Sequence, residues 1–181
     1  MAGNVLIAGI GNIFQGDDAF GVEVVHKLAE ASLPADVRLL DIGIRSIDLA
    51  FALLDQYDLT ILVDATSHGG APGTLYTIEI DPQEISQRCD ESSIVNSHSL
   101  DPVRVLSFAA SMGASFKRVL LVACEPLVVE HDESGHIGLS DVVKAAMEPA
   151  VETIRELVEE FRQRDTVNKL KEEEVYTHER P

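Results

Sequence analysis

Cysteine is scarce in this sequence of 181 residues: there are only two, Cys89 and Cys124. Two cysteines are too few for the disulfide framework that stabilises small secreted domains. We therefore expect reduced thiols, with Cys124 buried at the end of a strand.

Positive charge is also in short supply. The chain has 14 Lys and Arg residues against 31 Asp and Glu residues, which gives a formal net charge of −17. A nucleic-acid partner requires a basic surface that neutralises phosphates, so this composition argues against nucleic-acid binding. Two interpretations of the acidity remain open. It keeps the protein soluble, or it repels anions and attracts cations and basic protein segments.

Long apolar runs are missing, and no segment reaches the roughly 18 residues that a membrane span requires. The first residues, MAGNVLIAGIGN, lack the basic segment and the long apolar run of a secretory signal. Hydrophobic residues still make up 45% of the chain, enough for a globular core. We expect a cytoplasmic monomer without membrane insertion. Its single domain should span residues 1–164, followed by a charged, flexible tail at residues 165–181.

Short β-branched runs alternate with longer amphipathic stretches along the chain. The pattern predicts strands at Val5–Ile10, Val37–Ile42, Leu59–Ala65, Thr74–Ile80 and Arg118–Cys124. It predicts helices at Ala19–Ala31, Ile47–Asp55, Asp101–Met112 and Asp141–Arg162, with Pro149 expected to kink or divide the last one.

This alternation predicts an α/β fold of three layers, a twisted, mostly parallel five-stranded sheet with helices on both faces. The segment LTILVDA (residues 59–65) is almost entirely apolar, as is typical of a central parallel strand. The loop SHGGAPG that follows is too short for a crossover helix. The next strand should therefore be antiparallel or lie at an edge of the sheet.

The first predicted strand runs into the loop GIGNIFQGDD (residues 9–18), which begins like a dinucleotide-binding loop. Phe14 occupies the place of the third glycine of G-x-G-x-x-G, and Asp17 and Asp18 would repel a pyrophosphate. The chain also lacks the phosphate-binding pattern G-x-x-x-x-G-K-[ST] and the nucleophile pattern G-x-S-x-G. We therefore expect no nucleotide cofactor, and nucleophilic catalysis has little support.

Aspartates end three of the predicted strands or their loops. Asp18 follows the first strand, Asp41 ends the second and Asp64 ends the third, so all three should reach the carboxyl edge of the sheet, where open α/β folds place their sites. Asp17 is interpreted as a helix cap or a support, and capping alone remains an alternative for the pair. His98 precedes a predicted helix, and with two carboxylates it would complete an O,O,N ligand set for a divalent transition metal.

Taken together, five segments resemble the maturation endopeptidases of nickel–iron hydrogenases. They lie in order from about residue 4 to residue 160: GIGNIFQGDDAFGVEVV, DIGIRSIDLAFALLDQYD, LTILVDATSHGGAPGTLY, NSHSLDPVRVLSFAASMG and VLLVACEPLVVE with the later GLSDVV. The combination of G-x-G-N-x-x-x-x-D-[DE] with the later V-D-A and S-H-x-x-x-P segments is more specific than any one of them.

The resemblance implies a function and a set of site residues. Such proteases remove a short C-terminal extension from the hydrogenase large-subunit precursor after nickel insertion, and the nickel is supplied by the precursor. The family's metal-binding positions fall on Asp18, Asp64 and His98. Asp18 and Asp64 are also candidates for activating water, and Asp41 is a candidate acid/base or supporting carboxylate. Two alternatives are a non-catalytic nickel-binding or carrier protein and a small-molecule hydrolase or phosphorylase on a related sheet, which the acidic loop disfavours.

Overall fold

The computed structural model of the chain describes residues 3–87, 102–127 and 137–178. Within these ranges five strands form one sheet: β1 (Val5–Ile10), β2 (Val37–Gly43), β3 (Leu59–Ala65), β4 (Leu75–Ile80) and β5 (Val119–Cys124). The strand order is β2-β1-β3-β5-β4, and all neighbours are parallel except β4, which runs antiparallel to β5 at one edge. Both the mostly parallel five-stranded sheet and the antiparallel edge position of its fourth strand are confirmed.

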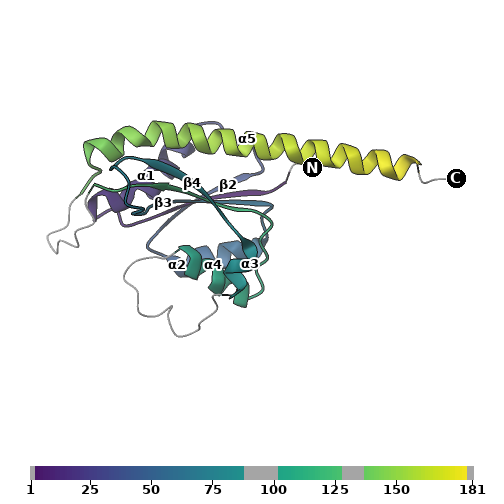
Figure 1. Cartoon of the computed structure of the whole chain (residues 1–181), viewed down its shortest axis with the longest axis horizontal. Helices are drawn as coiled ribbons and strands as arrows, with labels where there is room; N and C mark the ends of the chain where they lie inside the picture. Colours follow the sequence, from purple (N-terminus) through teal and green to yellow (C-terminus); the bar gives the residue numbers. More distant parts are fainter. Residues whose placement is uncertain (1–2, 88–101, 128–136, 179–181) are drawn as a thin grey trace.

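Helices cover both faces of this sheet and complete the predicted three layers (Figure 1). The helices α1 (Phe20–Ala29) and α5 (Asp141–His178) pack on one face, and α2 (Ser46–Ala52), α3 (Pro82–Gln87) and α4 (Pro102–Ser111) pack on the other. Side chains of β1 alternate between the two cores: Ile7 joins the core under α1 and α5, while Leu6 joins the core under α2, α3 and α4. Because β1, β3 and β5 are covered on both faces, their sequences are almost continuously apolar.

Glycines allow the opening loop and α1 to pack closely on the strand ends. A Cβ atom on Gly9 would lie 2.2 Å from the carbonyl oxygen of Gly21, and one on Gly21 would lie 2.1 Å from the carbonyl oxygen of Val63. Gly11 has a φ of +131°, and a Cβ there would lie 1.7 Å from the carbonyl oxygen of Asp18. The glycines that suggested a nucleotide loop therefore serve close backbone packing, which brings the turn containing Asp18 against the sheet.

The helix α5 is longer than the sequence predicted. The expected helix ended at Arg162 with a tail from residue 165, but α5 continues to His178 and its last turns project beyond the sheet (Figure 1). Asp165, the first residue of the expected tail, accepts a hydrogen bond from the backbone N–H of Gly3 (3.0 Å). The predicted end is wrong because the apolar stripe stops there, whereas the following helical residues include no glycine or proline. A helix that is already nucleated can continue through them. None of the helices in the described ranges is both long and apolar enough to cross a membrane.

Two other local features differ from expectation. Pro149 lies inside α5 without dividing it, because buried side chains such as Ala146 and Ala150 hold the helix to the sheet on both sides of the proline. The sequence pattern gave no indication of α3, which contributes the buried side chain of Ile85 to the core. A helix of less than two turns is too short to show a 3.6-residue period.

Candidate functional site

Asp64 lies at the edge of the sheet formed by the carboxyl ends of the parallel strands. It is the next-to-last residue of β3 and is only 6% exposed. Its Oδ1 accepts a hydrogen bond from the N–H of Ala65 (2.9 Å), and its Oδ2 accepts one from the hydroxyl of Thr66 (3.4 Å). Leu62, two residues earlier, packs in the core under α2, α3 and α4, so strand alternation places Asp64 on that face. The result is a buried carboxylate oriented by the loop that follows it.

Asp18 reaches the same edge on the short turn η1 (Gly16–Ala19), which packs against β3. Its side chain is partly exposed. Its Oδ2 accepts a hydrogen bond from the N–H of Asn12 (2.6 Å), which closes the opening loop on itself. Neighbouring elements therefore deliver the two predicted metal-binding carboxylates to one edge of the sheet.

Asp17 is committed to the protein's own structure. It is 3% exposed and accepts hydrogen bonds from the N–H of Leu127 (2.8 Å) and from both the N–H (2.6 Å) and the hydroxyl (2.8 Å) of Ser140. Leu127 follows β5, and Ser140 immediately precedes α5. The predicted supporting role is confirmed. The carboxylate does not cap its own helix, since neither η1 nor α1 has a side-chain cap.

Asp41 lies at this edge too, but on the opposite face of the sheet. Asp41 pairs with Gly9, and Gly9 pairs with Val63 near the end of β3. Asp41 and Val63 are therefore two strands apart, with about 9 to 10 Å between their backbones. Its carboxylate contacts the ring of His26 on α1 (2.9 Å), and its side chain is 43% exposed. The sequence predicted a common edge for the three aspartates; the structure adds that Asp41 and Asp64 belong to different faces.

His98, the third predicted metal ligand, lies outside the described residues, as does Cys89. The helix that follows His98 in the chain is α4, which begins at Pro102 and packs on the same face as Asp64. Within the described ranges, no three His, Cys, Asp or Glu side chains form a group that could hold a metal ion. Of the predicted triad, the structure therefore places the two carboxylates.

Glu125 is a buried carboxylate at this edge that the sequence analysis missed. It is 3% exposed and accepts hydrogen bonds from the Ser67 hydroxyl (2.7 Å), the N–H groups of His68 (2.8 Å) and Gly69 (3.2 Å), and the Tyr76 hydroxyl (3.2 Å). The Ser67 hydroxyl first and the His68 amide next, with smaller effects from the Gly70 and Gly69 amides, lower the pKa of Glu125 to about 2 although burial opposes them. The sequence does contain an indication of this site: VACEP places a charged residue directly after a buried strand, much as LVDAT places one at the end of a buried strand.

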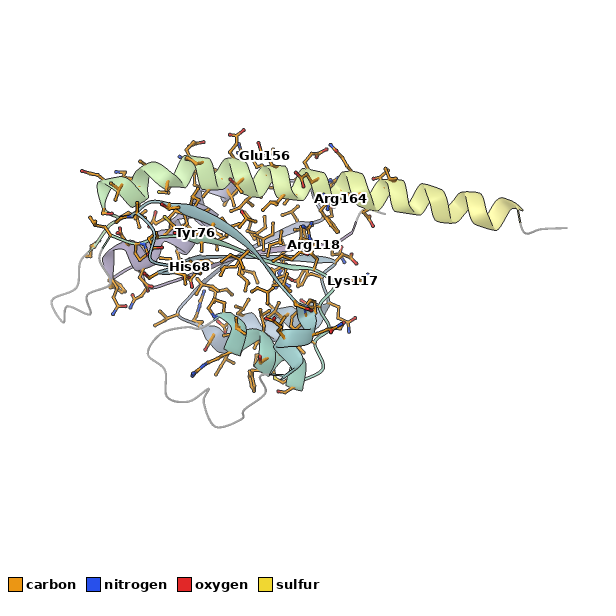
Figure 2. All side chains as sticks on the ribbon, in the orientation of Figure 1. His68, Tyr76, Lys117, Arg118, Glu156 and Arg164 are labelled. Atoms are coloured by element: carbon orange, nitrogen blue, oxygen red, sulfur yellow. The ribbon has the colours of Figure 1, made fainter. Side chains whose placement is uncertain are left out.

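His68 lies in the loop between β3 and β4. It is exposed, and its ring packs against Tyr76 with the ring centroids 4.8 Å apart. Figure 2 shows both rings at the end of the sheet opposite Lys117 and Arg118. Since Arg118 immediately precedes β5, His68 belongs to the carboxyl edge, on a loop that Glu125 holds in place.

Cys124 is buried at the end of β5, as predicted. Burial, reinforced by the carboxylates of Asp17 and Glu125, raises the pKa of its thiol to about 11. A thiol that stays protonated at neutral pH is a poor nucleophile. In a Cys89→Ser variant we expect almost no reaction of the native protein with Ellman's reagent at mildly alkaline pH, and a full thiol per chain after unfolding in guanidinium. Rapid reaction of the native protein would contradict the raised pKa.

The sequence matches known proteins over most of its length. The family model described as hydrogenase maturation protease matches residues 22–157, a range that includes Asp64 and His98 and begins just after the turn that carries Asp18. The hydrogenase expression/formation protein HupD of Rhodobacter capsulatus is 35% identical over 155 residues, covering 84% of this chain and 70% of the relative. The hydrogenase 2 maturation protease of Escherichia coli K12 is 31% identical over 151 residues, covering 83% of this chain and 87% of the relative.

Solved structures agree with this match. The hydrogenase maturating endopeptidase HybD from Escherichia coli superimposes with a TM-score of 0.69 at 29% identity, covering 87% of this chain and 93% of that one. The [NiFe] hydrogenase maturation protease HycI from Thermococcus kodakarensis KOD1 gives a TM-score of 0.65 at 28% identity, covering 87% and 94%. The α/β fold is thus shared over nearly the full length of both neighbours.

Proposed function

The chain belongs to the hydrogenase maturation protease family, and from that premise we propose that it removes the C-terminal extension of a nickel-loaded hydrogenase large-subunit precursor in the cytoplasm. Membership of the family makes the protein an endopeptidase, a hydrolase. The nickel-loaded state of the precursor and the C-terminal position of the cut are the parts that we propose.

The observation that supports this proposal most directly is the delivery of Asp18 and Asp64 to one edge of the sheet. The turn that carries Asp18 packs against the strand that carries Asp64, and the glycines of the opening loop make that approach possible. We assign Asp18, Asp64 and His98 as the ligands that meet the precursor's nickel. Carboxylate oxygens with an imidazole nitrogen suit a divalent transition metal.

The chemistry follows from the position of the metal in the substrate. Binding of the precursor's nickel by these side chains brings the neighbouring peptide bond to the edge of the sheet and fixes its orientation. Nickel can polarise the peptide carbonyl or lower the pKa of a water molecule, and Asp18 or Asp64 can accept the proton of the attacking water. Asp41 is assigned a supporting role, since its carboxylate lies on the other face and contacts His26.

The charge of the protein supports a cationic target. The net charge of −17 creates a field that attracts a metal-bearing segment and repels phosphates and other anions. This preference agrees with an opening loop that presents carboxylates where a nucleotide loop would present bare N–H groups.

Incubation of the protein with its large-subunit precursor, with and without nickel, tests the proposal. We expect the nickel-loaded precursor alone to lose a short C-terminal peptide, detected as a fall in mass by mass spectrometry. Cleavage of nickel-free precursor at the same rate would remove nickel from the mechanism. Tight nickel binding by the isolated chain without cleavage of any precursor would favour the carrier alternative.

A further inference from the structure

We propose that Glu125 is a positioning residue, whose buried carboxylate holds the loop after β3 so that Asp64 keeps the orientation required for cleavage. The inference rests on the proposed function of Asp64. It adds a residue that directly follows β5 and acts through the loop rather than as a ligand or a base.

The contacts form a continuous chain from Glu125 to Asp64. Glu125 accepts hydrogen bonds from Ser67, His68 and Gly69, three consecutive residues of an exposed loop. The two residues before them, Ala65 and Thr66, are those whose N–H and hydroxyl groups bond to the Asp64 carboxylate. Ser67, the first of the three residues held by Glu125, is therefore separated from Asp64 only by Ala65 and Thr66.

Backbone hydrogen bonds keep Glu125 itself in place. Its N–H donates to the carbonyl of Thr74 (2.9 Å), and its carbonyl accepts from the N–H of Gly73 (2.7 Å). The N–H of Thr66 donates to the carbonyl of Cys124, the preceding residue (3.0 Å). The backbone that carries the Glu125 carboxylate is thus bonded to both ends of the loop that the carboxylate organises.

The two hydroxyl donors to Glu125 differ in where they lead. Ser67 belongs to the loop that continues into Asp64, whereas Tyr76 is on β4, beyond the far end of that loop. Each can be removed singly, by Ser67→Ala and by Tyr76→Phe, and the phenyl ring would preserve the contact with His68. Comparison of the two variants therefore distinguishes two roles of Glu125. If it orients Asp64, only Ser67→Ala should lower activity; if its donors merely support a buried charge, both variants should lower it.

The experiment compares cleavage of the nickel-loaded precursor by Glu125→Ala, Glu125→Gln, Ser67→Ala and Tyr76→Phe with that by the wild-type protein. We expect Glu125→Ala to lower kcat by about 10- to 100-fold, as displacement of a reacting group does, while KM changes by less than about twofold. Glu125→Gln should recover part of the loss, because an amide oxygen still accepts from some of the donors. Ser67→Ala should lower kcat several-fold, and Tyr76→Phe should leave it within about twofold.

Hydrogen exchange supplies a measurement that does not depend on the precursor. The amides of Ala65, His68 and Gly69 should exchange faster in Glu125→Gln and Ser67→Ala than in the wild type. Equal kcat values for the wild type and the Glu125 variants, or equal losses from Ser67→Ala and Tyr76→Phe, would overturn the positioning role. If the wild-type protein cleaves no precursor, the proposed function fails; unchanged exchange in the variants would then overturn the loop-holding role separately.

Discussion

Replacing Asp64 with asparagine should lower kcat/KM for the nickel-loaded precursor by at least about 100-fold and leave the protein folded. The amide has nearly the same size, and its oxygen can still accept the hydrogen bond that Ala65 donates to Asp64. It carries no charge, however, and a neutral amide oxygen binds a divalent transition metal more weakly than a carboxylate oxygen does. The measurement is the initial rate of peptide release, with urea unfolding to show a change in stability below about 1 kcal/mol.

Asp41→Asn is the matched control for this experiment, because it also neutralises a carboxylate near the end of a parallel strand. Asp41 lies on the other face and is 43% exposed, so we expect a loss of less than about tenfold from a supporting role. A loss of about 100-fold or more would instead assign Asp41 the acid/base step. Wild-type activity of Asp64→Asn would remove Asp64 from the site altogether.

The core strands could be predicted from the sequence because their burial leaves a clear signature. The bounds of β1 and β3 agree with the prediction residue for residue, since each is an almost continuous apolar run with a polar residue or a glycine on either side. The end of α5 could not be predicted in this way. Beyond residue 161 the apolar stripe ends, so the sequence no longer indicates which side chains pack against the sheet. Only the absence of helix breakers indicates that the helix continues.

The sequence predicts the edge of the sheet at which the site residues lie, but not the face of the sheet on which each of them lies. Parallel strands bring their carboxyl ends together whatever their sequence, so Asp18 and Asp64 could be placed at one edge. The face of Asp41 depends on the alternation of β2, an edge strand of mixed burial whose sequence does not distinguish inside from outside. Glu125 was missed for a related reason: one charge after an apolar strand resembles the start of a loop, and its four donors come from residues more than 45 positions away.

Replacing Asp17 with alanine should cost about 3 to 5 kcal/mol of the free energy of unfolding and lower Tm by roughly 10 °C. The substitution removes the acceptor of three hydrogen bonds and leaves the N–H groups of Leu127 and Ser140 without their partner. Those residues precede and follow a long segment between β5 and α5, so both of its ends lose their attachment to the opening loop. Thermal and urea unfolding measure the effect, and Asp17→Asn should recover part of it because the amide retains one acceptor oxygen.

Replacing the next residue, Asp18, with asparagine should have the opposite effect: a small change in stability and a large loss of activity. Asp18 is partly exposed, and the hydrogen bond from Asn12 can be kept by an amide oxygen, so stability should change by less than about 1 kcal/mol. Loss of a negative charge from the proposed nickel ligands should lower kcat/KM by at least about 100-fold. Equal effects of the Asp17 and Asp18 substitutions on stability would contradict this division. The two adjacent carboxylates can have separate roles only because the η1 turn directs Asp17 into the protein's own hydrogen bonds and leaves Asp18 accessible at the edge of the sheet.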